Sequence, residues 1–208
     1  MLSHWLGALH EFAVEGVVII GPDPYGGPEE RRALAFHPPF IAAAAADLAA
    51  SRDFGAGWRA SDAPLVAWQH IAKGEPGATA RWRTLLRERK LRTVVRVELP
   101  LPGGRAFECF LFSPREFANR SEAALLVWSA LSIWPLVKRA VAEAHCPLTR
   151  TEIRCLELAF DGLTARESAA VLECRERTVN YHVAQAMGKL HVTSKMAAIQ
   201  RACWFGVL

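Results

Sequence analysis

The sequence lacks the residue spacings that mark a metal site, a disulfide framework or a nucleotide-binding loop. Its 208 residues include five cysteines, an odd number, and no two form a Cys-x-x-Cys pair, so neither a metal site nor any cofactor is predicted. No phosphate-binding glycine loop is present. The side chains suited to catalysis share no motif spacing: His10, His37, His70 and Cys109. We therefore expect a protein that is not an enzyme, the alternative being an enzyme with an appended binding domain.

The sequence also lacks the patterns that are typical of a membrane-spanning helix and of a signal peptide. The longest apolar run, Ala123 to Val137, contains Pro135 and is shorter than the roughly 20 residues that a bilayer-spanning helix needs. The first residues have no basic stretch before their apolar ones, as a signal peptide would. We expect a cytoplasmic protein with no membrane contact, in which this run is a core helix or a dimer interface.

The composition is that of a packed globular protein. Hydrophobic residues make up 51% of the chain and charged residues 22%, a balance that is typical of folded domains and unlike disordered chains. The formal net charge is +4. A small basic excess permits binding to nucleic acid without establishing it.

The first part of the chain mixes helical and strand patterns. Apolar spacing predicts a buried strand at Val17–Ile20 and a β-hairpin whose strands contain Val95–Leu99 and Phe107–Leu111, with the second strand inside a sheet because both its faces are apolar. Helices are predicted at residues 2–12, 29–35, 41–51, 61–71, 78–89 and 122–144. Pro135 should kink or split the last of these. We expect an α+β domain over residues 1–145, joined at residues 145–147 to an all-helical domain over residues 146–208.

In the second domain, capping residues predict where two of the helices begin. Thr149 with Glu152, and Thr164 with Glu167, are capping boxes, in which each side chain satisfies a backbone N–H of the other residue. A turn near residues 173–176 leads to a third helix, about 177–190, and a fourth follows Thr193. Two short capped helices, a turn and a longer helix are the layout of a helix-turn-helix, although a plain three-helix bundle begins in the same way.

The third helix separates an apolar stripe from a face suited to DNA. At 100° per residue, Val179, Val183 and Leu190 fall together and should be core. The opposite side carries small residues and hydrogen-bonding groups, which a major groove accepts. These are Arg177, Asn180, Tyr181, Ala184, Gln185 and Gly188.

Residues 148–208 resemble the LuxR-type helix-turn-helix of bacterial transcription regulators. The resemblance is carried by Leu148-Thr149 with Glu152, Gly162-Leu163-Thr164, Arg177-Thr178-Val179-Asn180-Tyr181-His182, Lys189-Leu190 and Ala197-Ala198-Ile199. It implies that Thr178 and Lys189 contact phosphates, that Asn180, Tyr181 and Ala184 face bases, and that the fourth helix helps to pair two DNA-binding domains. Arg175 stands where the family has a capping serine, which removes the cap and adds a cation for a phosphate.

The first domain resembles the ligand-binding half of quorum-sensing LuxR proteins. The matching stretches are Ser61-Asp62-Ala63-Pro64-Leu65-Val66 and Leu91-Arg92-Thr93-Val94, together with the closing residues 201–208. The resemblance implies a GAF/PAS-like sheet flanked by helices, a homodimer on double-stranded DNA, and a small effector such as an acyl-homoserine lactone. The candidate effector site comprises Trp58, Asp62, Trp68 and Trp82.

Two other interpretations of the first domain stay open. Asp62 could simply cap the helix that begins near Pro64, with the tryptophans in the core, and Phe107 and Cys109 could line a pocket or a closed core. The chain could then be a LuxR-type regulator that needs no ligand and is controlled by a partner protein.

Overall fold

A computed structural model describes residues 1–22, 31–51, 66–71, 81–101 and 105–208. The chain divides into two compact units, the first ending at Val137 and the second spanning Lys138–Leu208. Each unit is described by itself below.

The first unit is built on one antiparallel sheet of five strands. They are β1 (Gly16–Pro22), β2 (Arg31–His37), β3 (Val66–His70), β4 (Thr93–Leu101) and β5 (Arg105–Ser113). Their order across the sheet is β2-β1-β5-β4-β3. The predicted hairpin is confirmed as β4 and β5, with Val97 opposite Cys109 and Leu99 opposite Phe107. The apolar β5 lies between β1 and β4, as its two apolar faces predict.

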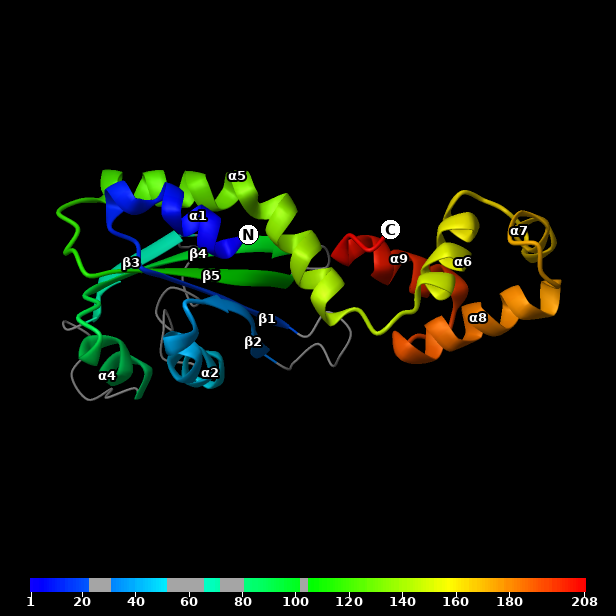
Figure 1. Ribbon diagram of the computed structural model, residues 1–208, viewed down its shortest axis with the longest axis horizontal. Coiled ribbons are helices and arrows are strands. Elements are labelled where there is room, and N and C mark those ends of the chain that lie inside the picture. Colours follow the sequence, from blue (N-terminus) through cyan, green and yellow to red (C-terminus); the bar gives the residue numbers. More distant parts are fainter. Residues whose placement is uncertain (23–30, 52–65, 72–80, 102–104) are drawn as a thin grey trace. The chain divides into compact units, whose positions relative to one another are not determined.

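Helices cover both faces of this sheet (Figure 1). The pair α2 (Ala42–Ala50) and α4 (Arg81–Glu88) packs on one face, where their buried side chains form a cluster with Val18, Ile20 and Phe110. On the other face lie α1 (Leu2–Ala8) and the long α5 (Arg120–His145). The ring of Trp134 on α5 meets that of Phe107 edge to face, with centroids 5.4 Å apart. Phe107 and Cys109 are fully buried beneath this helix, which favours the closed core over the pocket.

Two predicted helices in this unit are wrong. The segment expected to be helical at residues 29–35 forms β2, which pairs with β1. The segment expected to be helical through Ile71 contains β3, which pairs with β4 from Val66 to His70. Both strands lie at the edges of the sheet. Without β2 and β3, the outer N–H and C=O groups of β1 and β4 would be left unpaired. Tertiary pairing therefore overrides the helix-forming residues and the capping pattern of the two segments.

The long helix α5 is not split by its proline. It runs without interruption from Arg120 to His145, with Pro135 in its interior. Pro135 is exposed, so water can satisfy the backbone carbonyl that the missing N–H leaves unpaired. By length and composition alone, the stretch Ser121–His145 would also be sufficient to cross a membrane. Its buried side chains, including Leu126 and Ala130, nevertheless make one face of α5 part of the protein core.

The second unit carries four helices after the end of α5. They are α6 (Arg150–Phe160), α7 (Ala165–Val171), α8 (Glu176–Lys189) and α9 (Lys195–Phe205). Both predicted capping boxes are formed: Thr149 and Glu152 open α6, and Thr164 and Glu167 open α7. A buried cluster centred on Leu156, Leu190 and Ile199 holds α6, α8 and α9 together. A second, smaller cluster joins α6, α7 and α8 through Cys155, Ala169 and Val179.

Candidate nucleic-acid interface

In the second unit, the apolar edge of α8 is buried and its polar face is exposed to solvent. Val179 and Leu190 are 2% and 0% exposed, whereas Tyr181 is 59% exposed. The other outward-facing residues predicted to meet DNA are exposed as well: Arg175, Arg177, Asn180, Ala184 and Gln185. Thr178 is half-buried. The side chains that could read base edges are therefore together on one accessible helix face.

The start of α8 has no side-chain cap. Its N-cap residue is Arg175, whose backbone is extended and whose side chain makes no capping hydrogen bond. By contrast, Thr149 and Thr164 each accept a hydrogen bond from the third residue of their helix. The loss of the cap predicted from the sequence is thus confirmed, while the predicted contact of Arg175 with a phosphate stays a prediction.

Lys189, at the end of α8, is tied to the start of α6. Its Nζ lies 2.8 Å from Oε2 of Glu152, whose side chain is only 4% exposed. The same carboxylate accepts a hydrogen bond from the backbone N–H of Thr149. Burial acts to raise the pKa of Glu152, but the hydrogen bonds from Lys189 and Thr149 outweigh it and hold that pKa below its usual value. Lys189 therefore fixes α8 against α6, and its predicted contact with a phosphate stays a prediction.

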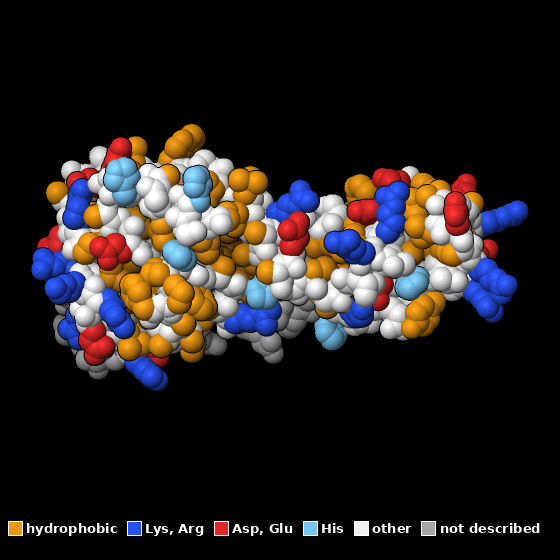
Figure 2. Space-filling view, viewed as in Figure 1, with side chains coloured by type: hydrophobic (Ala, Val, Ile, Leu, Met, Phe, Trp, Pro, Cys, Tyr) orange, Lys and Arg blue, Asp and Glu red, His pale blue; other side chains and the backbone are white. Residues whose placement is uncertain are grey.

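Two further cations on this unit were not identified from the sequence. Arg166 on α7 and Lys195, the first residue of α9, are both exposed. Lys195 and Asn180 line the same small crevice, of about 30 Å³, so a cation of α9 lies close to the recognition face of α8. Figure 2 shows Lys and Arg side chains at the end of the unit that carries α7 and the start of α8. Only packing of α9 against α8 brings Lys195 there, so no sequence spacing would have revealed it.

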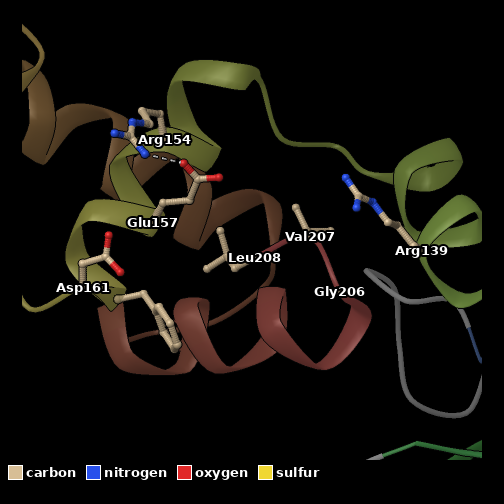
Figure 3. A pocket seen from close by; sticks show the side chains of 8 residues that line it. Arg139, Arg154, Glu157, Asp161, Gly206, Val207 and Leu208 are labelled. Atoms are coloured by element: carbon tan, nitrogen blue, oxygen red, sulfur yellow. Dashed lines mark hydrogen bonds and ion pairs between the residues drawn. The ribbon is translucent and has the colours of Figure 1, made fainter. Parts of the chain in front are cut away.

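A wider hollow in the second unit does not resemble a ligand site. It measures about 460 Å³ and is lined by Arg139, Arg154, Glu157, Phe160 and Asp161, with the last three residues of the chain. Figure 3 shows Arg154 turned toward Glu157, and the two form an ion pair of 2.9 Å. The hollow is lined by charges of both signs and is open to solvent, so its lining favours no particular class of ligand.

Only one residue of the predicted effector site has a described side chain. Trp58 and Asp62 lie outside the described residues, and Trp68 is placed only by its backbone in β3. Trp82, on α4, is completely buried in the cluster with α2. Its backbone N–H donates a 2.5 Å hydrogen bond to Oδ2 of Asp47 on α2. The effector site stays a prediction. The acid beside Trp82 in the structure is Asp47, which the sequence did not identify because it lies in an alanine-rich helix.

A group of charged side chains on the sheet, centred on Glu108, was also missed. Nε of Arg96 on β4 lies 2.6 Å from Oε1 of Glu108 on β5, and both side chains are at most 10% exposed. Arg31 on β2 pairs with the other oxygen of Glu108, and Arg96 also reaches Glu98. In sequence, Arg96 and Glu98 look like the solvent-facing half of an alternating strand. In the structure Arg96 is buried, with 6% of its side chain exposed, whereas Glu98 remains 33% exposed.

Comparison with known proteins identifies the second unit. Residues 146–202 match the model of the bacterial regulatory proteins of the luxR family. The chain is 39% identical over 61 residues to the transcriptional activator protein AnoR of Acinetobacter nosocomialis, which covers 29% of this chain and 26% of that protein. It is 30% identical over 84 residues to the transcriptional activator protein LuxR of Aliivibrio fischeri, covering 40% and 34%. The C-terminal unit is a LuxR-type helix-turn-helix domain, and the matches span between about a quarter and about a third of the length of these relatives.

The likeness to a solved structure extends over both units. The chain resembles SdiA of Escherichia coli with a TM-score of 0.51 at 16% sequence identity, over 99% of this chain and 90% of that one. At this identity the likeness concerns the fold. It supports an N-terminal antiparallel sheet flanked by helices, followed by an all-helical unit.

Proposed function

We propose that the protein is a cytoplasmic transcription regulator that binds specific sequences of double-stranded DNA as a homodimer, gated by a small effector such as an acyl-homoserine lactone. The observation that carries the proposal is the orientation of α8: its apolar edge is buried and its polar face is accessible. A helix presented in this way fits the major groove, where Asn and Gln suit adenine and Arg suits guanine or phosphate. The relatives that share the domain are named as transcriptional activators.

Selection from random duplexes tests DNA binding directly. The reduced protein should enrich one related set of sequences, whose affinity is then measured by fluorescence anisotropy. Asn180→Ala should weaken binding to the selected site by about 1–3 kcal/mol and relax its specificity. Arg177→Ala should weaken all sequences alike and make binding less dependent on salt. Failure to enrich any duplex, or binding that neither change affects, would overturn the assignment.

An exposed apolar face on α5 supports the homodimer. Leu125, Trp128 and Leu136 are 58%, 74% and 64% exposed, and their separations of three, eight and eleven residues place them on one side of a helix. Large exposed apolar side chains gathered on one side of a helix are typical of an interaction surface. A dimer would carry two α8 helices, as a two-fold DNA site with half-sites about 34 Å apart requires.

Sedimentation equilibrium tests this interface. Trp128→Glu should shift the protein from dimer to monomer and weaken binding to a two-fold site. Phe40→Glu serves as the matched control, because Phe40 is an exposed aromatic residue away from α5. A Trp128→Glu protein that remains dimeric would exclude this face as the interface.

The effector is tested by thermal stability. A ligand present at about 100 times its Kd should stabilise the protein by about 2.7 kcal/mol, and Trp82→Phe should reduce that gain more than Phe40→Leu does. Acyl-homoserine lactones of several chain lengths are the first candidates. If none changes the melting temperature, the alternative is favoured, in which a partner protein controls the regulator without a ligand.

Nothing in the described residues favours catalysis. Cys109 is fully buried under α5, and burial raises the pKa of its thiol far above the usual range. A thiol that stays protonated at neutral pH is a poor nucleophile. His10 is exposed on a short turn and hydrogen-bonds only locally, to the carbonyl of Gly7. We therefore infer that the protein is not an enzyme.

A further inference from the structure

Positive charge is concentrated in the N-terminal unit where α4 leads into β4. Residues 81–92 contain six basic side chains and one acid, a formal charge of +5 in a chain whose total is +4. Four of these cations lie within six residues and all are exposed: Arg87, Arg89, Lys90 and Arg92. We call these four the basic turn. Figure 2 shows Lys and Arg side chains in the region where Figure 1 places α4.

The cations of the basic turn have no acidic partner in the part of the chain that the structure describes. None of the four forms an ion pair there. By contrast, Arg31, Arg96 and Arg115, elsewhere in the same unit, each pair with a glutamate. The guanidinium of Arg89 lies over the ring of Phe40, 5.1 Å from its centroid. A guanidinium stacked on a ring keeps its N–H edge for a carboxylate, so the basic turn can bind an anionic group from outside the chain.

The backbone of the basic turn is held in one conformation. The N–H of Lys90 donates to the carbonyl of Arg87 at 2.8 Å, and that of Leu91 donates to Leu86 at 3.1 Å. These two bonds define a Schellman motif at the end of α4. Leu91 is fully buried in the core, and the N–H of Arg92 donates to a carbonyl of β5 at 2.8 Å. A backbone already fixed in this way loses little freedom when a partner binds.

Lys90 occupies a position that favours glycine. Its φ is 61°, in the left-handed region that residues with a side chain rarely adopt. At this place in a Schellman motif glycine is the usual residue. Cations near the end of a helix also interact favourably with its dipole, but Arg87 already supplies one there. The lysine therefore strains the backbone, which favours a role for its charge.

We propose that the basic turn, together with Phe40, is a docking surface for an acidic segment of a partner protein, one that carries aspartate or glutamate beside an apolar side chain. Phe40 is 45% exposed, and arginine combined with aromatic side chains is typical of protein–protein interfaces. Glu88 is exposed between these cations. It repels a continuous phosphate backbone, whereas a peptide can present a neutral or basic residue to it. The surface therefore suits a protein better than a nucleic acid.

Fluorescence anisotropy with the full-length protein tests the docking surface. The probe is a short labelled peptide of aspartate, glutamate, leucine and phenylalanine, and its matched control has asparagine and glutamine in place of the acids. The acidic peptide should bind, more weakly as salt is added, and the neutral peptide should not. Arg89→Glu/Lys90→Glu should weaken binding at least about tenfold. Arg139→Glu/Arg150→Glu makes the same change of charge at exposed cations of the second unit and should bind as the unchanged protein does.

Two milder variants separate docking from folding. Lys90→Gly removes one cation and relieves the left-handed backbone, so the melting temperature should not fall while the affinity for the acidic peptide does. Phe40→Ala keeps the charge and should also weaken binding. A Lys90→Gly protein that melts lower and binds the peptide unchanged would show that the lysine serves the fold, against the proposal.

The contrary outcomes are distinct. The proposal is overturned if the acidic peptide does not bind, or if it binds Arg89→Glu/Lys90→Glu as tightly as the unchanged protein. It is also overturned if that variant keeps its affinity for the peptide and loses affinity for duplex DNA, because the basic turn then serves nucleic acid. The peptide measurement contains no DNA, so it stands even if selection from random duplexes fails and the proposed function with it.

Discussion

The two units differ in where they keep their polar side chains. In the C-terminal unit the side chains suited to DNA lie outside, on α8, and the residues that hold the helix lie inside in two small apolar clusters. In the N-terminal unit Arg96 and Glu108 are buried between the sheet and its helices. Folding and recognition are therefore carried by different residues in the C-terminal unit, whereas the buried charges of the N-terminal unit belong to its fold.

The largest effect is expected when Glu108, the acid that pairs with both Arg96 and Arg31, is removed. Glu108→Ala leaves Arg96 buried without its main partner, and Arg31 without its carboxylate. Breaking a buried pair in this way costs about 3–5 kcal/mol, to be measured by urea unfolding. Glu143→Ala is the control, because its pair with Arg139 is exposed and should cost less than about 1 kcal/mol. Equal costs would mean that the charges of the sheet are not structural.

The next test separates folding from recognition within the C-terminal unit. Leu190→Ala removes a fully buried side chain and should lower the free energy of unfolding by about 2–5 kcal/mol. Tyr181→Ala changes an exposed residue on the same helix and should alter that free energy by no more than about 0.5 kcal/mol, while weakening DNA binding. A Tyr181→Ala protein as unstable as Leu190→Ala would contradict the orientation of α8.

A smaller effect is expected at the uncapped start of α8. Arg175→Ser would place a hydroxyl on an extended N-cap backbone and should raise the free energy of unfolding by about 1 kcal/mol. The same change removes a cation from the DNA face, so affinity for duplex should fall. A protein stabilised without loss of affinity would show that Arg175 does not contact phosphate.

The smallest expected effect is a pH dependence within the C-terminal unit. The pKa of Glu152 is lowered from 4.5 in the folded protein, so its contribution to stability is present above that pH and is lost as the pH falls through the lowered value. The unfolding free energy of the unchanged protein should therefore fall more steeply below about pH 4.5 than that of Glu152→Gln. Glu157→Gln, which alters an exposed acid on the same helix, should retain the steep fall.

The predictions agree with the structure where the signal depends on residues close together in the sequence. The capping boxes at Thr149 and Thr164 set the starts of α6 and α7 within four residues of chain, and both are found as predicted. The hairpin of β4 and β5 is also local. The segments that became β2 and β3 are decided by strands far away in sequence, β1 and β4, and there the local helical signals misled. Lys189 is another such case, since its partner Glu152 lies 37 residues away.

The sequence alone determined the helical domain and which face of α8 is exposed, because a 3.6-residue period and paired capping residues act over a few turns of chain. Tertiary structure decided the edges of the sheet, the inward turn of Arg96 and Glu108, and the approach of Lys195 to Asn180. These depend on which backbone edges and helix faces meet across long distances in sequence. Such pairings are settled by the burial and hydrogen bonding of the whole unit.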